Sequence, residues 1–445
     1  MLNPIQITVS TSGPGLTRKS FGSPMVVGHH SNFPELYRRY SGASALTDIV
    51  ADGFTVYDPI YKQVRGLLSA NNKPEYVYVG RLPTAFSQTF DLTVKNAEVR
   101  AGQVYSFSIV SPDGTTTAIS YTAIAGDTGT TVAVALNTLI NAVTDLSSTS
   151  SANVITVAAD NTGELFLITG YDIGLVDYKD NTADSALVTE VTAIKNAGAE
   201  SYGLLLADCC SAARVMVLAA FVETQTDVLF VTSYDTDNQD SGSTVSLSYQ
   251  ASNAGYDRTV VCCSDDQAND FAAAWVGDRF PYDAGSVNWA HTILSGVSGT
   301  SYSSSAIAAM DANNANYYVK VHTNTNAAYW GKAAGGEYID IVRGIDWIIA
   351  TMRENILSRF LAVKKIPYNN TGAEIISGGI EEALIEGEGN DFIDSEQPYT
   401  ITYPDYREIP LATKQSRHYP DFKFKAYLVG AANTTSIEGV LKVGD

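Results

Sequence analysis

The sequence is short of the residues on which catalysis, metal binding and contact with nucleic acids or membranes usually depend. Its 445 residues include 4 cysteines and 5 histidines, and 28 Lys and Arg stand against 48 Asp and Glu, a formal net charge of −20. Phosphate backbones and anionic lipid surfaces repel a protein of this charge. No apolar run approaches the roughly 18 residues of a membrane span, and the first residues lack a signal peptide. We therefore expect a cytosolic chain with no nucleic-acid partner and no membrane insertion.

The few cysteines and histidines are also placed unfavourably for chemistry. The cysteines form two vicinal pairs, Cys209-Cys210 and Cys262-Cys263. Neighbours on a strand point to opposite faces, which suits neither a disulfide framework nor a zinc site. No two histidines have the i, i+4 spacing of a helical metal site, and neither His-Glu-x-x-His nor Gly-x-Ser-x-Gly occurs. We predict no catalytic residue, no metal and no cofactor.

The sequence does contain the composition and periodicity of a large α/β protein. The AVILMFWYC set makes up 45% and charged residues 17%, which is typical of a packed globular chain, and the length suits several domains of roughly 100–200 residues. Short apolar runs at 24–28, 76–79, 203–207, 227–231 and 259–262 alternate with helical patterns at 56–68, 212–223 and 243–254. Apolar strands joined by helices predict a parallel sheet with helices on both faces.

Two regions depart from this pattern. Between 87 and 197 the sequence is rich in Thr, Ser, Ala and Gly, with short alternating runs and one helix near 131–143, which predicts an inserted, mostly β domain. From about 338 to 363, apolar residues recur at spacings of three and four, which predicts a long amphipathic helix with one buried stripe. After a weaker helix at 374–386, alternating segments at 422–429 and 437–443 indicate a hairpin.

The expected fold is therefore an α/β and α+β multidomain protein. Its parts are an N-terminal arm at 1–20, a discontinuous α/β core at 21–86 and 198–330, the inserted domain at 87–197, a C-terminal domain at 331–430 and a C-terminal arm at 431–445. Both arms alternate apolar and polar residues, as exposed edge strands do, and such strands pair readily with another chain. The simpler alternative is that each end completes a sheet of its own.

One cluster of carboxylates is a candidate for catalysis. Asp235 and Asp237 follow the apolar run at 227–231, and Asp265 follows the next run along the chain. Carboxylates at the ends of neighbouring strands could hold Mg²⁺ for phosphoryl or hydrolytic chemistry. The spacing matches no calcium loop, however, and Asp and Ser are also favoured at helix caps and turns, so the pattern favours a solvated capping loop.

Several segments, in their order and spacing, are similar to those of one protein family. They are IQITVS at 5–10 with GPG at 13–15, PEYVYVGR at 74–81, AAWVGDRFP at 273–281 with GSVNW at 285–289, GKAAGGEYID at 331–340, and IPY at 366–368. In these segments the chain resembles contractile phage tail sheath proteins, over most of its length apart from the inserted region. The resemblance implies a structural subunit, not an enzyme, that polymerises as stacked rings or helical strands.

The resemblance also implies a mechanism and partners. The sheath surrounds a tail tube, is metastable when extended, and contracts to drive the tube through the host cell envelope, with no cofactor. Its partners would be further copies of itself, the tail tube protein, and the baseplate and tail terminator proteins, in a virion tail assembled in the host cytoplasm. The alternatives are another virion protein, of the tube or baseplate, and, less favoured, a hydrolase or phosphatase using Asp235, Asp237 and Asp265.

The resemblance finally assigns roles to individual residues. The terminal arms would add strands to the sheets of neighbouring subunits, anchored by their inward-facing residues Ile5, Ile7, Val9, Ile437, Leu441 and Val443. The C-terminal domain would face the tube, and the inserted domain would lie outside. Because the chain is otherwise acidic, we expect the basic side of the long helix to contact a negatively charged tube through Arg353, Arg359, Lys364 and Lys365. The alternative is a solvated helix face, or pairing with the carboxylates at 374–396 of a neighbour.

Overall fold

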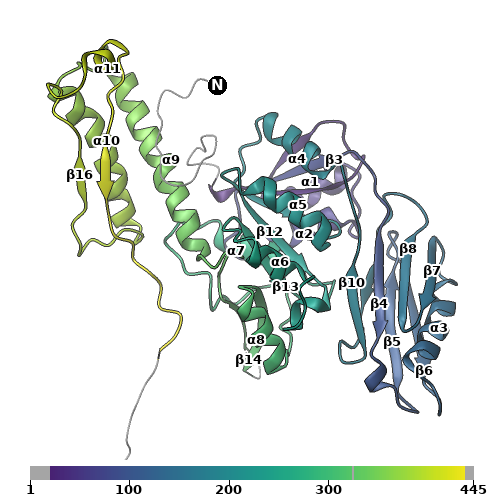
Figure 1. The fold of residues 1–445 in the computed structure, drawn as a ribbon. Helices are drawn as coiled ribbons and strands as arrows, with labels where there is room; N and C mark the ends of the chain where they lie inside the picture. Colours follow the sequence, from purple (N-terminus) through teal and green to yellow (C-terminus); the bar gives the residue numbers. More distant parts are fainter. Residues whose placement is uncertain (1–20, 323–324, 436–445) are drawn as a thin grey trace, which may run out of the picture. The chain divides into compact units, whose positions relative to one another are not determined.

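The computed structural model describes residues 21–322 and 325–435. By its contacts the chain divides into two compact units, Met1–Ala350 and Thr351–Asp445, here called the N-terminal unit and the C-terminal unit (Figure 1). No helix in the described ranges is long and apolar enough to cross a membrane.

An eight-stranded sheet forms the centre of the N-terminal unit, in the order β15-β14-β13-β12-β11-β1-β3-β2. Six adjacent strands are parallel: β14 (Asn316–His322), β13 (Thr259–Cys263), β12 (Val228–Ser233), β11 (Gly203–Leu206), β1 (Pro24–His29) and β3 (Tyr76–Leu82). The edge strands β2 (Tyr37–Ser41) and β15 (Thr325–Tyr329) are antiparallel to their neighbours. Every residue of β11, β12 and β13 is buried, because both faces of a parallel sheet are covered.

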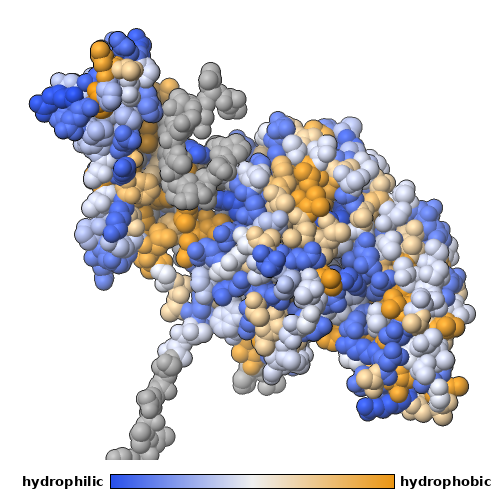
Figure 2. Space-filling model, in the orientation of Figure 1, coloured by the Kyte–Doolittle hydropathy of each residue, from blue (hydrophilic) through white to orange (hydrophobic). Residues whose placement is uncertain are grey.

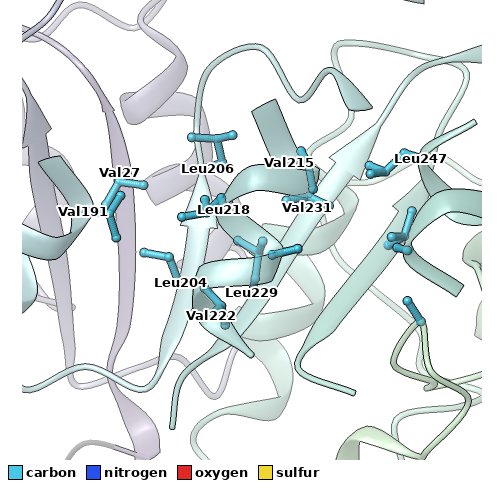
Figure 3. Close-up of a cluster of buried hydrophobic side chains, with 14 of the residues drawn as sticks. Val27, Val191, Leu204, Leu206, Val215, Leu218, Val222, Leu229, Val231 and Leu247 are labelled. Carbon is cyan, nitrogen blue, oxygen red and sulfur yellow. The ribbon is translucent and has the colours of Figure 1, made fainter. Parts of the chain in front are cut away.

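Helices pack on both faces of this sheet. On one face lie α4 (Leu187–Asn196), α5 (Ala212–Val222), α6 (Leu247–Asn253) and α8 (Ser304–Ala312), and their core includes Leu204 and Leu206 of β11 (Figure 3). On the other face lie α2 (Pro59–Leu67), with α1 (Ala45–Ala51) beside it, and α7 (Phe271–Arg279). There Phe230 of β12 stacks on Trp289 with ring centroids 5.4 Å apart. Successive residues of a strand point to opposite faces, so a single apolar run contributes to both cores.

Between β3 and α4 the chain forms two antiparallel sheets with a core of their own. One contains β10 (Val176–Asp180), β4 (Thr89–Val94), β8 (Val154–Ala159) and β7 (Leu146–Ser151); the other contains β6 (Thr116–Thr122), β5 (Val104–Val110) and β9 (Leu167–Thr169). α3 (Gly129–Ile140) packs with them, and the Thr128 hydroxyl caps its first turn. Residues of β4 and β5 alternate between deeper and shallower burial, as expected of strands with one side on a shared core. We call the segment from β4 to β10 the inserted domain.

The last helix of the expected 87–197 segment belongs to the α/β core instead. Leu187, Val191 and Ile194 of α4 are buried in the same cluster as the strands of the large sheet. Gly80 of β3 allows this close packing, because a Cβ there would lie 3.0 Å from Cδ1 of Ile194. Composition placed α4 with the inserted domain because its Thr and Ala content resembles that of the preceding strands.

The expected boundary at 331 also moves, because the first half of the long helix is built into the N-terminal unit. α9 spans Ile339–Ala362. Its Asp346 accepts two hydrogen bonds from Arg258 (2.7 and 2.8 Å) and one from Oη of Tyr202 (2.9 Å). Arg343, which lies off the predicted apolar stripe, is nevertheless 1% exposed and donates to four backbone carbonyl oxygens. These buried polar contacts tie residues up to 350 to the central sheet.

The C-terminal unit contains the second half of α9 together with α10 (Asn370–Gly389), α11 (Leu411–Gln415) and a small antiparallel sheet of β16 (Thr400–Thr402) and β17 (Lys423–Lys425). Apolar residues of α10, among them Ile376, Ile380 and Leu384, are buried. β17 falls in the 422–429 segment, but it pairs with β16. The other half of the expected hairpin, 437–443, lies outside the described residues.

Candidate functional site

The acidic loop after β12 binds the inserted domain to the α/β core. Asp235 is 4% exposed, and its Oδ1 accepts from the backbone N–H of Asp180 at the end of β10 (2.7 Å). Oγ1 of Thr236 accepts from the N–H of Tyr178 (3.1 Å) and donates to its carbonyl oxygen (3.2 Å). The short turn η3 (Thr236–Gln239) therefore covers the outer edge of β10, which is an edge strand of its sheet.

The other two candidate carboxylates are also engaged within the chain. Asp237 forms an ion pair with Lys179 of β10 (2.7 Å), and Oδ1 of Asp265 accepts from Oγ1 of Thr300 (2.5 Å). Among the described residues, no group of three or more His, Cys, Asp or Glu side chains could hold a metal ion. The loop is also not the solvated cap that its turn-forming residues favoured, because Asp235 is buried in the contact between two domains.

Burial changes the protonation of two carboxyl groups in this contact. Removal from water raises the pKa of Asp180 to about 6, although Thr182 and Arg214 favour its charged form. Removal from water also raises the pKa of Asp235, and the nearby Asp180 carboxylate adds to the shift. A carboxyl group whose pKa rises on folding stabilises the folded state at low pH, and that contribution is lost as the pH rises through the folded pKa.

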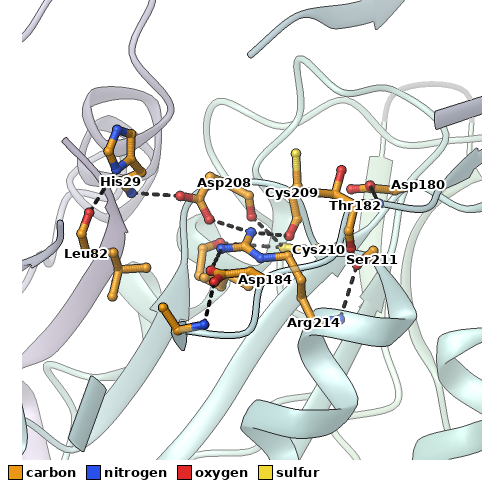
Figure 4. A network of polar contacts seen from close by, with 12 residues as sticks. His29, Leu82, Asp180, Thr182, Asp184, Asp208, Cys209, Cys210, Ser211 and Arg214 are labelled. Carbon is orange, nitrogen blue, oxygen red and sulfur yellow. Dashed lines mark hydrogen bonds and ion pairs between the residues drawn. The ribbon is translucent and has the colours of Figure 1, made fainter. Parts of the chain in front are cut away.

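A buried arginine occupies the place where α/β proteins usually bind ligands. The order of the strands reverses between β1 and β11: later strands add on one side of this point and earlier ones on the other. Arg214 of α5 lies at the carboxyl ends of these two strands and is 1% exposed (Figure 4). Its guanidinium pairs with Asp208 (2.7 Å) and Asp184 (3.1 Å), and Oδ2 of Asp208 accepts from the backbone N–H of His29 (2.7 Å). Open α/β sheets bind ligands in this crevice, but here the chain's own ion pairs fill it.

The cavities beside this cluster are small. One of about 70 Å³ lies between the α/β core and the inserted domain, lined by Cys209, Cys210 and Tyr234 among others, and one of about 190 Å³ lies beside His29. Sites for drug-sized ligands measure roughly 300–1,000 Å³. Burial raises the pKa of both thiols, which disfavours the nucleophilic thiolate. The geometry of this edge gives no support to nucleotide binding or to thiol chemistry.

Sequence reasoning missed the residues of these buried ion pairs. Arg214 is the one charged residue between Ala212 and Val222, and Asp346 interrupts the apolar run that surrounds it on α9. A lone charge inside an apolar segment indicates a buried, paired group, because an unpaired one would be very costly. That signal could have identified the arginine and the aspartate, though not their partners.

Of the four basic residues expected to face a tube, Arg359 is turned toward α10. Its Nη2 donates to the carbonyl oxygen of Gly378 (2.9 Å) and lies 3.1 Å from Oε2 of Glu382. The expected alternative was pairing with carboxylates of the 374–396 stretch in a neighbour; here the pairing occurs within one chain. Arg353 is half-buried on α9.

Lys364 and Lys365 lie just beyond the last residue of α9 and are exposed. Of the predicted apolar stripe, Ile349, Met352 and Ile356 are buried and Val342 and Ile345 are half-buried. Phe360 and Val363, at its end, are 41% and 39% exposed. Leu357 and Leu361, on the outer side of the helix, are 39% and 78% exposed. The end of α9 is therefore an apolar surface beside two lysines, and the four predicted cations do not form one basic face.

The sheet of β16 and β17 is the smallest of those that the structure describes. Each strand has three residues, and within the described ranges each pairs only with the other. A two-stranded sheet of this size is marginally stable alone, so its open edges could accept further strands. The arm residues Ile5, Ile7, Val9, Ile437, Leu441 and Val443 lie outside the described residues.

No family model matches the sequence, and no curated protein matches it significantly. Solved structures do match the fold. A chain of the cryo-EM structure of the anti-feeding prophage (AFP) baseplate matches with a TM-score of 0.55 and 12% identity, covering 100% of both chains. A chain of the contracted AFP helical sheath matches with a TM-score of 0.55 and 11% identity, covering 99% of both. The contracted PVC sheath complex, from an extracellular contractile injection system, matches with a TM-score of 0.52 and 11% identity over 100% of this chain and 98% of that one.

The chain has the fold of contractile sheath proteins. This finding confirms, at the level of the fold, the resemblance inferred from the sequence segments. The matches cover 98–100% of each chain.

Replacing Arg214 with methionine should strongly destabilise the N-terminal unit. The change leaves the carboxylates of Asp208 and Asp184 buried without a cation, which we expect to lower the free energy of unfolding by roughly 3–5 kcal/mol. The matched control is Arg100→Met. Arg100 is 74% exposed and pairs with Glu98 at a long distance of 3.7 Å, and exposed pairs of this kind contribute about 0–1 kcal/mol to stability. Denaturant unfolding followed by tryptophan fluorescence measures both; equal losses would contradict the assignment.

The contact between β10 and η3 should weaken as the pH rises from 4 to 7. Asp180 loses its proton in this range, because its pKa is about 6, and its buried charge then lies beside the Asp235 carboxyl group. In hydrogen exchange corrected for the intrinsic rate, protection of the peptide containing the Tyr178 and Asp180 amides should fall with pH. Asp180→Asn should remove most of this pH dependence, which corresponds to a change on the order of 2 kcal/mol in the free energy of opening. Asp237→Asn should retain the pH dependence. Identical pH profiles in the wild type and Asp180→Asn would refute this expectation.

Proposed function

We propose that the chain is the subunit of a contractile sheath that polymerises around a tail tube and contracts to drive the tube through a host cell envelope. The observation that carries the proposal is the match of the whole chain, end to end, to chains from contracted sheaths. Asp235, Asp237 and Asp265 are engaged in contacts within the chain, which disfavours the alternative hydrolase. A structural, non-enzymatic function is consistent with every surface described above.

The partners follow from this function. They would be further copies of the chain, a tail tube protein, and baseplate and terminator proteins at the two ends of the sheath, in a tail-like particle assembled in the host cytoplasm. The matched structures come from an anti-feeding prophage and an extracellular contractile injection system. The same subunit physics would serve an infectious phage or such an injection particle. The inserted domain would lie on the outside of the sheath.

We further propose that the terminal arms join neighbouring subunits by adding strands to the β16–β17 sheet. Both of its strands are three residues long, with the middle residues Ile401 and Phe424 half-buried and their neighbours exposed. Added strands would complete the backbone hydrogen bonds of both edges and enlarge a sheet that, without its packing against α10, would be marginally stable. Ile5, Ile7 and Val9, and Ile437, Leu441 and Val443, would supply its apolar face.

The contact with the tube is proposed at the end of α9. Lys364 and Lys365 are exposed there beside Leu357 and Leu361, and cations on an acidic subunit are suited to a negatively charged tube. Arg353 and Arg359 would contribute less, Arg359 because its guanidinium is already held by α10.

If the arms add strands, substitutions on the two faces of the N-terminal arm should affect polymer formation differently. Replacing Ile5, Ile7 and Val9 together with aspartate should abolish sedimentation of assembled polymer, because charges would replace the apolar face of the added strand. Replacing Gln6 and Thr8 with aspartate, on the opposite face, should leave most of the polymer. The melting temperature of the soluble subunit should be equal in both variants. Polymer formation by the triple variant at the wild-type level would exclude arm pairing through these residues.

Charge reversal tests the contact with the tube. We expect Lys364→Glu to weaken assembly on purified tubes by roughly tenfold, since the reversal removes an attraction and adds a repulsion, each of up to about 1 kcal/mol. Arg359→Glu should also weaken it, in part by breaking the pair with Glu382. The control is Arg417→Glu, which changes the net charge equally at an exposed position of the same unit. Unchanged assembly of Lys364→Glu would rule out this part of the tube contact.

A further inference from the structure

The outer face of α5 is apolar although it is exposed. Between Ala212 and Val222 the one charged residue, Arg214, is buried. Ala213, Val217 and Ala220 face outward, and Val217 is 56% exposed. Figure 2 shows the corresponding hydrophobic patch at the position of α5 in Figure 1. A helix that is hydrophobic all round is typical of a buried helix.

The fold itself does not require these outward residues. The inner face of α5 is supplied by Val215, Leu218, Ala219 and Val222, which are all buried in the core of the large sheet. Met216 and Phe221 pack against the edge of that core and are half-buried. Scattered single hydrophobic residues on a surface are ordinary, but here five apolar residues adjoin along one helix, and such patches mark interaction sites. We call Ala213, Met216, Val217, Ala220 and Phe221 the α5 face.

The shape of the α5 face suits a packed partner. Ala213, Val217 and Ala220 have the spacing i, i+4, i+7 of one helical ridge, and their side chains are small. Small residues on a ridge let a partner element approach closely, to the roughly 8–10 Å typical of packed helices. α4 and α6 lie on either side of α5, so the face is the middle of a helical layer.

We propose that the α5 face packs against a second copy of this chain in the assembled polymer, an inference that rests on the proposed sheath function. The charge of the chain favours this occupant. Copies that each carry a net charge of −20 repel one another wherever acidic surfaces meet, so contacts between copies require patches without acidic residues. The α5 face has no charged side chain, whereas a basic partner would be attracted to the acidic surfaces elsewhere.

The α5 face is too small to hold two isolated subunits together. A helix of 11 residues is about 16 Å long, and one such face buries much less than the roughly 800 Å² per partner of a stable complex. The contact should therefore not hold an isolated dimer together. In a polymer it acts together with strand addition, which raises the effective concentration of the two faces.

A matched pair of variants tests the proposal. Val217→Arg places a charge in the α5 face, and Val134→Arg places the same charge on α3, at a helical valine that is 51% exposed. Sedimentation with and without tube protein gives the concentration at which polymer appears. We expect Val217→Arg to raise it by roughly tenfold or more, with an unchanged melting temperature of the subunit, and Val134→Arg to leave it at the wild-type value.

A photo-crosslinking residue, p-benzoylphenylalanine, at position 217 tests the occupant directly. In assembled polymer it should produce a species of twice the chain mass, which is absent from dilute subunits. Normal polymerisation of Val217→Arg, or polymer without the crosslinked species, would overturn the α5 proposal while leaving the sheath function intact. Absence of polymer from the wild type with tube protein present would instead refute the proposed function, and this inference with it.

Discussion

The ion pairs of Arg214 are the contact on which the N-terminal unit most depends. A parallel sheet covered on both faces is apolar throughout, and its carboxyl edge is where polar loops converge. Arg214 compensates Asp208, which follows β11, and Asp184, which leads into α4. Burying a guanidinium is costly, and two carboxylates compensate the charge of Arg214. The cluster therefore holds the first turn of α5 against the segment by which the chain returns from the inserted domain to α4.

The rest of the unit is arranged around that edge. The inserted domain is joined to the core beside it, through Asp235 and Thr236, and the crevice used for ligands in related architectures is filled. A second buried pair, Arg258 with Asp346, ties α9 to the start of β13. Polar groups are thus used inside the molecule to position domains. Apolar groups appear outside it, on α5 and at the end of α9, which is the distribution expected of a subunit whose function is contact with other chains.

The sequence could predict the α/β sheet, its helices on both faces and the long helix, because continuous apolar strands and a 3.6-residue period are local signals. It could not place α4, since the burial of Leu187, Val191 and Ile194 depends on β3, the strand that contains Gly80 and lies far away in the sequence. Nor could it show that Asp235 is buried, because Asp in a turn-forming loop is usually solvated. The basic side of α9 is a prediction from the helical spacing, the acidic remainder of the chain and the family resemblance. The four cations do not share one face, because Arg359 pairs with Glu382 of α10 and the helix ends before Lys364.

The central claim is that this chain polymerises into a sheath, and electron microscopy of the purified, untagged protein tests it most directly. Free ends are essential, because tags would obstruct the arms. We expect hollow cylinders with a regular axial repeat, formed by the protein alone or once tube protein is added. Monodisperse particles at every concentration, with tube protein present, would contradict it.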